Sequence, residues 1–218
     1  MIQLFNVIKK YGRGSPALDD ISLKIEKGEF VFLTGPSGAG KTTVLKIIFG
    51  WEHFEEGQVL VQGVNIGRLD SKNIYTLRRS IGVIFQGYKL LANKTVFENV
   101  AFAQEVTNRD RKTIKFKTWE ALKNVGLTSK KDSFPVHLSG GEQQRVAIAR
   151  AMVNGPPIIL ADEPTGNLDT EISLEILKLF EELNRNGVTI IFATHSQDIL
   201  KFGNHRVIAL NRGKVVSS

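Results

Sequence analysis

The chain has 218 residues, of which 42% are hydrophobic and 23% are charged, a composition typical of a globular protein with one sizeable core. It has no cysteine, which excludes disulfide bonds and thiolate metal sites. No stretch approaches the ~18 continuous apolar residues of a membrane helix, and the first residues lack the layout of a secretory signal peptide. We therefore expect any membrane role to come through a partner, without direct insertion of this chain.

The net charge of +7 is concentrated in one segment. Residues 109–131 contain eight basic and two acidic side chains, which gives this segment a net charge of +6. Such a cluster is typical of a solvated helix face, of a surface that meets an anionic membrane, or of a nucleic-acid site. The sequence leaves these three possibilities open.

The N-terminal part is predicted to form short strands at residues 2–8, 21–25, 59–62 and 63–66, with turn residues between them. Short strands at such close intervals indicate a small antiparallel sheet. We expect this sheet to flank a mostly parallel core, because the strands that follow are apolar and alternate with helices.

Residues 30–49 are predicted to form a strand, a glycine loop and a helix in direct succession. The loop has the phosphate-binding pattern Gly-x-x-x-x-Gly-Lys-Thr. Its glycines let backbone N–H groups converge on a phosphate, Lys41 reaches the terminal phosphates, and Thr42 offers a hydroxyl to Mg²⁺. The alternative is a plain glycine-rich turn ahead of a helix. The predicted nucleotide contacts of the loop are Gly35, Pro36, Ser37, Gly38, Ala39, Gly40, Lys41, Thr42 and Thr43.

The middle of the chain is predicted to begin with a short apolar strand at residues 81–85 that ends in Gln86. Residues 87–137 are then expected to be mostly helical, with polar breaks near Asn108 and at 128–133. This helical segment carries the basic excess.

Residues Leu138 to Glu142 begin another predicted helix. Ser139 and Glu142 fit a capping box, which is the structural explanation. Two glycines in a first helical turn, Gly140 and Gly141, cost roughly 1 kcal/mol each relative to alanine, and a cap does not need them. They make sense if bare backbone N–H groups approach an anion. Because one nucleotide cannot easily use two helix starts of one monomer, the simplest arrangement is a head-to-tail dimer that shares two nucleotides.

The C-terminal part is predicted to alternate between strands and helices. The predicted elements are a strand at 158–161, a helix at 170–186, a strand at 188–194 and a strand pair at 207–210 and 214–216. Asp162 and Glu163 follow the first of these strands, and His195 follows the second. In open α/β sheets ligands bind at the carboxyl ends of the strands, so we expect these side chains to converge with Gln86 and the glycine loop.

These side chains suggest phosphoryl chemistry. Asp162 is expected to hold Mg²⁺, although it could instead cap a helix, and Glu163 is expected to orient or deprotonate the attacking water. His195 either contacts the γ-phosphate or is a buried structural histidine. Gln86 either reaches Mg²⁺ and the water or is a surface amide. Tyr11, in the loop after the first strand, either stacks on an adenine ring or is an ordinary surface tyrosine.

Taken together, the motifs resemble those of the nucleotide-binding subunit of ABC transporters, in the family's order and over essentially the whole chain. Residues 35–42 resemble the Walker A motif, and residues 158–163 resemble Walker B. Gln86 matches the Q-loop, residues 138–143 match the signature, and residues 166–169 match the D-loop. His195 matches the switch histidine, and Tyr11 matches the adenine-stacking aromatic residue.

The resemblance implies an ATP-hydrolysing dimer. ATP and Mg²⁺ are held by Lys41, Thr42 and Asp162 of one subunit, Glu163 is the catalytic base, and residues 139–141 of the other subunit complete the site. It further implies one α/β domain with a P-loop NTPase core, over residues 1–218. This domain comprises an antiparallel β part and nucleotide-binding core (1–86), an inserted helical subdomain (about 87–137), and the rest of the core (138–218).

Within this family, residues 134–146, 161–169 and 180–188 are similar to those of the FtsE group of bacterial cell-division ATPases. That likeness implies a cytoplasmic chain, peripheral on the inner face of the membrane, with an FtsX-like membrane partner that controls cell-wall hydrolysis. Lipoprotein-release and macrolide-efflux ATPases share many of these stretches. Two residues depart from the pattern: Gly87 stands where an acidic residue is common, and Ser196 where aspartate is common.

Two other classes of function stay open at this point. Nucleic-acid-associated ABC ATPases share the signature motif, and a basic segment suits DNA. Such proteins carry long coiled coils or zinc modules between the Walker motifs, whereas this chain has neither heptads nor cysteines there, so no nucleic acid is expected. A regulatory module without turnover is disfavoured by the presence of Glu163 and His195.

Overall fold

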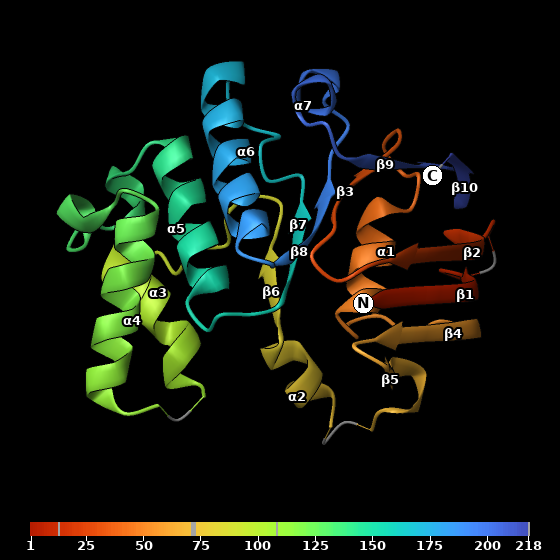
Figure 1. Ribbon diagram of the computed structural model, residues 1–218, viewed down its shortest axis with the longest axis horizontal. Helices are drawn as coiled ribbons and strands as arrows, with labels where there is room; N and C mark the ends of the chain where they lie inside the picture. The colour runs from red at the N-terminus through yellow and green to blue at the C-terminus, as the bar shows by residue number, and fades with distance from the viewer. Residues whose placement is uncertain (13, 71–72, 108, 218) are drawn as a thin grey trace.

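A six-stranded sheet runs through the middle of the molecule, in the order β10-β9-β3-β8-β7-β6 (Figure 1). The computed structural model describes residues 1–12, 14–70, 73–107 and 109–217. All neighbouring strands of this sheet are parallel except β10, which pairs antiparallel with β9. The strands are β3 (Phe30–Thr34), β6 (Ile81–Ile84), β7 (Ile158–Asp162), β8 (Thr189–Ala193), β9 (Arg206–Asn211) and β10 (Lys214–Ser217).

The register of the parallel strands aligns their carboxyl ends. Ala193 at the end of β8 lies between Leu33 of β3 and Asp162 of β7, and Ala161 pairs with Ile84 of β6. The residues that follow each strand are therefore delivered to one edge of the sheet.

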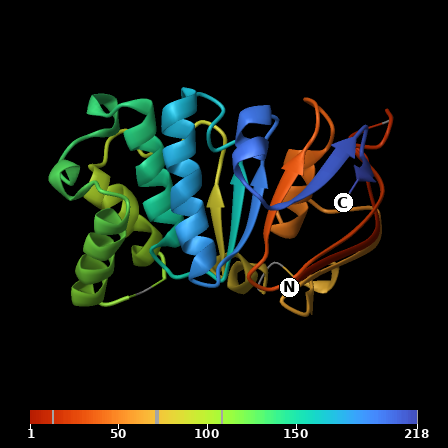
Figure 2. The same cartoon turned by 45° about the horizontal axis from the view of Figure 1, so that its top comes forward.

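The central strands β3, β6, β7 and β8 are largely apolar because both faces of the sheet are covered there. In β3, Val31 and Leu33 point into one hydrophobic core, whereas Phe30 and Phe32 point into the other. One core lies against α1 (Lys41–Ile48), and the other lies against α5 (Gly140–Met152) and α6 (Thr170–Arg185). Figure 2 shows α5 and α6 on one side of the sheet and α1 on the other.

The predicted antiparallel sheet is confirmed. It has the order β2-β1-β4-β5 and packs on the α1 side of the central sheet (Figure 1). Its strands are β1 (Ile2–Lys9), β2 (Leu18–Ile25), β4 (Glu56–Val61) and β5 (Val64–Asn65). The fourth predicted strand is shorter than expected, because the chain turns into a 3-10 helix at Ile66–Arg68, where Asn65 caps the backbone N–H of Gly67.

The segment predicted to be mostly helical contains two helices, α3 (Val96–Glu105) and α4 (Arg111–Asn124), and a 3-10 turn at Thr128–Lys130 where a break was expected. The break near Asn108 falls outside the described residues. The helical prediction is wrong for residues 87–95, which form a loop. Buried Asn99 holds this loop: its side chain accepts from the N–H of Leu91 and donates to the carbonyls of Leu91 and Lys94.

Three short helical elements complete the fold: α2 (Ile74–Arg79), α7 (Gln197–Phe202) and a 3-10 turn at Pro135–His137 ahead of α5. Across the described ranges of the chain, no helix is both long and apolar enough to span a membrane. The division into subdomains at residues 86 and 137 stays a prediction.

Candidate functional site

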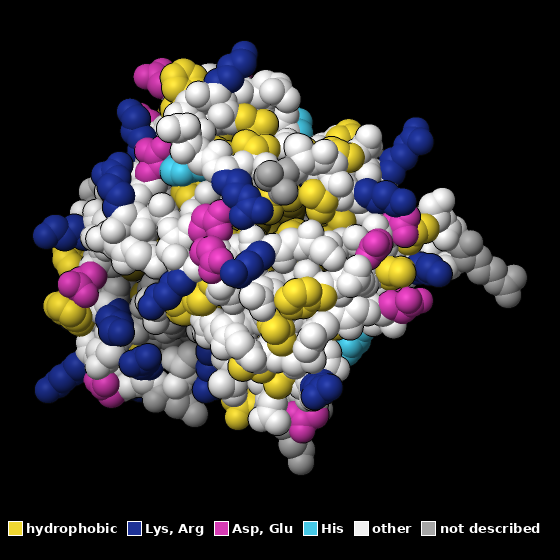
Figure 3. Space-filling view, turned by 45° about the vertical axis from the view of Figure 1, so that its right-hand side comes forward, with side chains coloured by type: hydrophobic (Ala, Val, Ile, Leu, Met, Phe, Trp, Pro, Cys, Tyr) yellow, Lys and Arg dark blue, Asp and Glu magenta, His cyan; other side chains and the backbone are white. Residues whose placement is uncertain are grey.

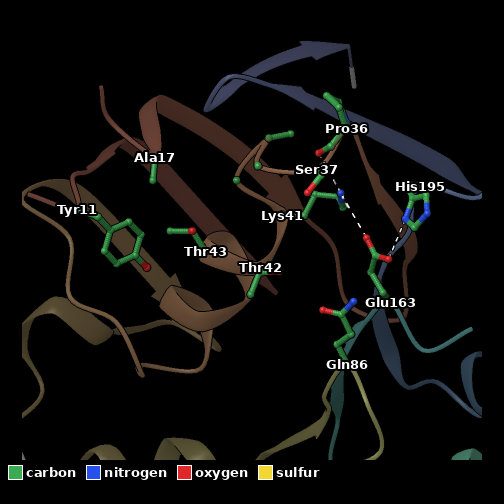
Figure 4. Close-up of a pocket in the computed structure, with 13 residues that line it drawn as sticks. Tyr11, Ala17, Pro36, Ser37, Lys41, Thr42, Thr43, Gln86, Glu163 and His195 are labelled. Carbon is green, nitrogen blue, oxygen red and sulfur yellow. Dashed lines mark hydrogen bonds and ion pairs between the residues drawn. The ribbon is translucent and has the colours of Figure 1, made fainter. Parts of the chain in front are cut away.

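A pocket of about 570 Å³ opens at the carboxyl edge of the central sheet. Figure 4 shows its lining side chains, which come from the glycine loop, the N-terminal sheet and the ends of β6, β7 and β8. The lining residues are Tyr11, Ala17, Pro36, Ser37, Gly38, Ala39, Gly40, Lys41, Thr42, Thr43, Gln86, Glu163 and His195. The structure thus brings together most of the side chains that the sequence placed in one site.

The glycine loop wraps around the ammonium group of Lys41, the first residue of α1. Lys41 is only 6% exposed, and its Nζ donates to the carbonyls of Gly35 at 2.7 Å and Pro36 at 3.3 Å. Gly35 has a φ of 142°, and a Cβ there would lie 2.2 Å from the carbonyl oxygen of Leu210 on β9. The loop therefore requires glycine for its packing against the sheet as well as for its backbone conformation.

Asp162 does not line the pocket itself, but it contacts Thr42, which does. The Thr42 hydroxyl donates to Asp162 Oδ1 at 3.1 Å. Burial raises the pKa of the Asp162 carboxyl, the hydrogen bond from Thr42 opposes this shift, and the neighbouring charge of Glu163 adds to it. The two oxygens are hard ligands of the kind that Mg²⁺ uses, together with phosphates and waters, so this pair fits that ion.

Replacement of Asp162 by asparagine is expected to stabilise the nucleotide-free protein at neutral pH. Because the folded-state pKa is raised, the folded chain holds this proton to a higher pH than the unfolded chain does. The carboxyl therefore favours folding only at low pH, and this contribution is lost as the pH rises through the folded pKa. We expect Asp162→Asn to raise the thermal midpoint at about pH 8 and to change it little near the unfolded pKa of about 3.9. An equal effect at both pH values would contradict the assigned pKa shift.

Glu163 lies between a lysine and a histidine. Its Oε2 lies 2.8 Å from Nδ1 of His195, and its Oε1 lies 3.6 Å from Nζ of Lys41 (Figure 4). Glu163 adopts a left-handed backbone conformation, with a φ of 47°, while its N–H donates to the carbonyl of Ala193 on β8. This strained turn aims the carboxylate into the pocket instead of along the strand. Gln86, at the end of β6, lines the same pocket.

The residues of the signature stretch do not line this pocket. Ser139 and Glu142 form the predicted capping box: the Ser139 side chain accepts from the Glu142 N–H, and Glu142 accepts from the Ser139 N–H. The cap points toward the same edge of the molecule as the glycine loop but belongs to α5, on the other side of α6 (Figure 1). Within one chain, the two predicted phosphate-binding helix starts are therefore separate.

The two glycines of this helix start have a packing role that the sequence did not reveal. A Cβ at Gly140 would lie 2.9 Å from the hydroxyl of Tyr88, and one at Gly141 would lie 2.7 Å from Cγ2 of Ile172 on α6. Packing alone therefore calls for small residues here. Packing and anion binding both account for the two glycines, and an experiment can separate them.

The pair Gly141→Ala and Ile172→Ala makes that separation. Overpacking by alanine at 141 is expected to lower the free energy of unfolding by about 1–3 kcal/mol. The higher helix propensity of alanine offsets roughly 1 kcal/mol of this loss. Adding Ile172→Ala removes the opposing methyl group, so the double variant should recover this overpacking loss in a double-mutant cycle by urea unfolding. If ATP turnover stays low in the repacked double variant, the backbone of Gly141 has a role in binding. No recovery of stability would refute the packing explanation.

Three residues near the site escaped the sequence analysis: Ala17, Tyr88 and Arg150. Arg150 of α5 donates to the carbonyls of Lys89 at 2.7 Å and Tyr88 at 2.9 Å, and both of these residues are left-handed, with φ values of 49° and 53°. Burial lowers the pKa of the Arg150 guanidinium. The signature helix is therefore fixed to the loop that follows Gln86, through carbonyl contacts that no side-chain pattern could indicate.

Comparison with known proteins agrees with this geometry. The family described as ABC transporter matches residues 18–166. The cell division ATP-binding protein FtsE of Streptococcus pneumoniae serotype 2 is 48% identical over 216 residues, which are 99% of this chain and 94% of that protein. FtsE of Bacillus subtilis is also 48% identical, over 99% of this chain and 95% of that protein. FtsE of Escherichia coli is 46% identical over 98% of this chain and 96% of that protein.

Two solved structures share the whole fold. The first is a dimeric post-hydrolysis state of the ATP-binding cassette MJ0796, bound to ADP and Pi. It matches this chain with a TM-score of 0.91 and 38% identity, and the match covers 100% of this chain and 97% of the cassette chain. A second dimeric structure of the same bacterial cassette has a TM-score of 0.91 and 39% identity over the same shares. The glycine loop with its buried lysine, the full-length relatives and the shared fold agree, and the chain belongs to the ABC transporter family as an ATP-binding subunit.

Proposed function

We propose that this chain hydrolyses ATP with Mg²⁺ in a head-to-tail dimer and drives a membrane partner. One observation carries the catalytic part of the proposal. Glu163 is held by Lys41 and His195 in the pocket that contains the glycine loop, one residue along the chain from the Asp162–Thr42 pair. A carboxylate, a cation and oxygen ligands for a metal thus lie together at the edge where this fold binds ligands.

In this proposal the glycine loop holds the phosphates of ATP. Lys41 exchanges the carbonyls of Gly35 and Pro36, and the carboxylate of Glu163, for phosphate oxygens. The backbone N–H groups of residues 35–43 surround the phosphates, and Tyr11, which is 49% exposed at the pocket rim, offers its ring to the adenine. Thr42, Asp162 and Gln86 would hold Mg²⁺ through their oxygens, and the bound ion would supply positive charge beside the phosphates.

Glu163 then acts as the base. Once Lys41 turns to the phosphates, the carboxylate is free to orient the attacking water and accept its proton. Nδ1 of His195 lies 2.8 Å from Oε2 of Glu163, which supports the orientation of the carboxylate, and its exposed ring can reach the γ-phosphate. Gln86 lines the same pocket and can report the state of the metal and the water to the loop that Arg150 holds.

A second copy of the chain completes the site. Residues Ser139 to Glu142 do not line the pocket of their own chain, and their exposed helix start is free to face the glycine loop of another copy. The two structures of the related cassette are dimeric, which supports this arrangement. Each dimer would then bind two ATP molecules between its subunits.

The partner is proposed from the relatives. Full-length likeness to FtsE proteins favours an FtsX-like membrane protein as the partner, with the chain peripheral on the inner face of the membrane and ATP use coupled to the control of cell-wall hydrolysis in division. Affinity purification of the chain from native membranes tests this proposal. Co-elution of an FtsX-like protein is expected, whereas co-elution of a lipoprotein-release or macrolide-efflux permease would replace it.

A further inference from the structure

One stripe of α4 combines cations with exposed aromatic rings. Lys112, Lys115, Phe116, Trp119 and Lys123 recur at intervals of three and four residues, which places them on one side of the helix. All five are exposed, with 63% of Phe116 and 45% of Trp119 accessible. The opposite side of α4 is buried through Thr118, Ala121 and Leu122. The aromatic rings of the stripe therefore do not contribute to the core of the protein.

The cations of this region are unpaired. Within the described ranges, none of the six basic residues between positions 109 and 123 forms an ion pair with a carboxylate, whereas Lys130 pairs with Glu142 and Lys131 with Asp132. Nearby Asp110 and Glu98 are engaged as helix caps. On the side of the molecule toward the helical segment, Figure 3 shows many Lys and Arg side chains standing out from the surface, with fewer Asp and Glu side chains among them. Glu98 and Asp132 line the same hollow as Lys112 and Lys115, but within the described ranges the lysines of the stripe form no ion pair. The stripe thus keeps a positive charge at the surface.

The aromatic rings border a shallow apolar hollow. Phe116 and Trp119, together with Phe97 of α3, line a cavity of about 800 Å³, and Lys112 and Lys115 stand beside them. This hollow is separate from the nucleotide pocket, with which it shares no lining residue. It holds no cluster of buried polar groups that would grip one small anion.

We propose that the α4 stripe binds an anionic phospholipid surface, with Phe116 and Trp119 entering the headgroup region and the lysines meeting the phosphates. The three lysines are spread over 11 residues, or roughly 16 Å of helix, so they suit many headgroups better than one converging ligand. Tryptophan and lysine are residues that favour membrane interfaces. The inference rests on the proposed function, which places the chain at the inner face of a membrane. It adds a direct contact between α4 and the lipid headgroups, without insertion of the chain across the bilayer.

Vesicle binding by the full chain tests this contact. Vesicles of phosphatidylcholine with about one third phosphatidylglycerol are compared with pure phosphatidylcholine at about 0.1 M salt, where charges act over ~10 Å. Trp119 reports directly, because Trp51 is the chain's other tryptophan and can be removed as Trp51→Phe. We expect binding to the anionic vesicles alone and a blue shift of Trp119 emission on binding.

Matched charge variants locate the contact. A lysine near an anionic membrane contributes about a five-fold change in affinity, so Lys112→Ser, Lys115→Ser and Lys123→Ser together should weaken binding about 100-fold. The control removes three exposed lysines elsewhere, Lys27→Ser, Lys178→Ser and Lys201→Ser, with the same change in net charge. We expect a much smaller loss in this control. Phe116→Ser should weaken binding without changing its dependence on salt.

Several outcomes would overturn the proposal. They are no preference for anionic vesicles, an equal loss in both triple-lysine variants, and binding that leaves Trp119 emission unchanged. Burial of Trp119 by the membrane partner in neutral detergent would assign the stripe to a protein contact instead, and tighter binding to duplex DNA than to vesicles would assign it to nucleic acid. ATP turnover, measured on the same variants, is expected to stay unchanged, so a failure of the stripe is distinguishable from a failure of the proposed ATPase.

Discussion

Glu163→Gln is expected to lower ATP turnover by about 10²–10⁴-fold, the usual contribution of a positioned general base. The amide keeps the shape of the side chain and its position beside Nδ1 of His195, but it cannot take a proton from water. ATP binding should survive, because the glycine loop, Thr42 and Asp162 are unchanged. The ATP-bound dimer should therefore accumulate, and size-exclusion chromatography with ATP and Mg²⁺ should detect it.

The matched control is Glu182→Gln, an exposed carboxylate on α6. It removes the same charge and should turn over ATP at the wild-type rate. If Glu163→Gln abolishes turnover but traps no ATP-bound dimer, Glu163 is not the base that reopens the dimer.

Lys41→Ala is expected to weaken ATP binding by about 10–100-fold, which is the usual contribution of a hydrogen bond to a charged group. The ammonium group is nearly buried and is held at the mouth of the loop by the carbonyls of Gly35 and Pro36, so little further ordering is needed when phosphate arrives. Isothermal titration with ATP measures the affinity directly.

Lys46→Ala is the control, on the same helix. Lys46 is 41% exposed and its Nζ lies 3.9 Å from Glu52 Oε1, a surface pair of little energetic value. Its loss should leave ATP affinity unchanged. Wild-type affinity in Lys41→Ala would mean that the loop binds phosphate through its backbone alone.

The sequence predicted the parts of the fold that depend on local pattern. Apolar runs such as residues 158–161 and 188–194 are strands because both faces of the sheet are buried, and the polar residues that follow them meet because parallel strands align their ends. Because the strand ends align, the sequence also predicted that Gln86, Glu163 and His195 lie in one pocket, as they do.

What the sequence could not predict depends on contacts between groups that are distant along the chain. Residues 87–95 carry an apolar pattern compatible with a helix, yet Asn99 and Arg150 bind their carbonyls and hold them as a loop. The packing of Ile172 against Gly141 depends on how α5 and α6 lie together, which no local spacing specifies. The ion pair between Lys41 and Glu163 likewise follows only from the folded position of both groups.

This ion pair also bears on how the site responds to its ligand. Nζ of Lys41 lies 3.6 Å from the carboxylate that is proposed to act as base. Arrival of phosphate would separate the two groups, so the same event that fills the loop frees the base. The loop after Gln86 is fixed to the signature helix through Arg150, so it links the pocket to the helix start that is proposed to face a second subunit.

The central claim is that the glycine loop of one copy and the signature helix of another close on the same ATP. Because the chain has no cysteine, single cysteines can be introduced in the Glu163→Gln background, one at Ser37 in the loop and one at His137, just ahead of the signature. The two single variants are mixed and treated with a short thiol cross-linker, with and without ATP. We expect a cross-linked dimer only in the mixture and only with ATP. Cross-linking within either variant alone, or in the mixture without ATP, would contradict the head-to-tail site.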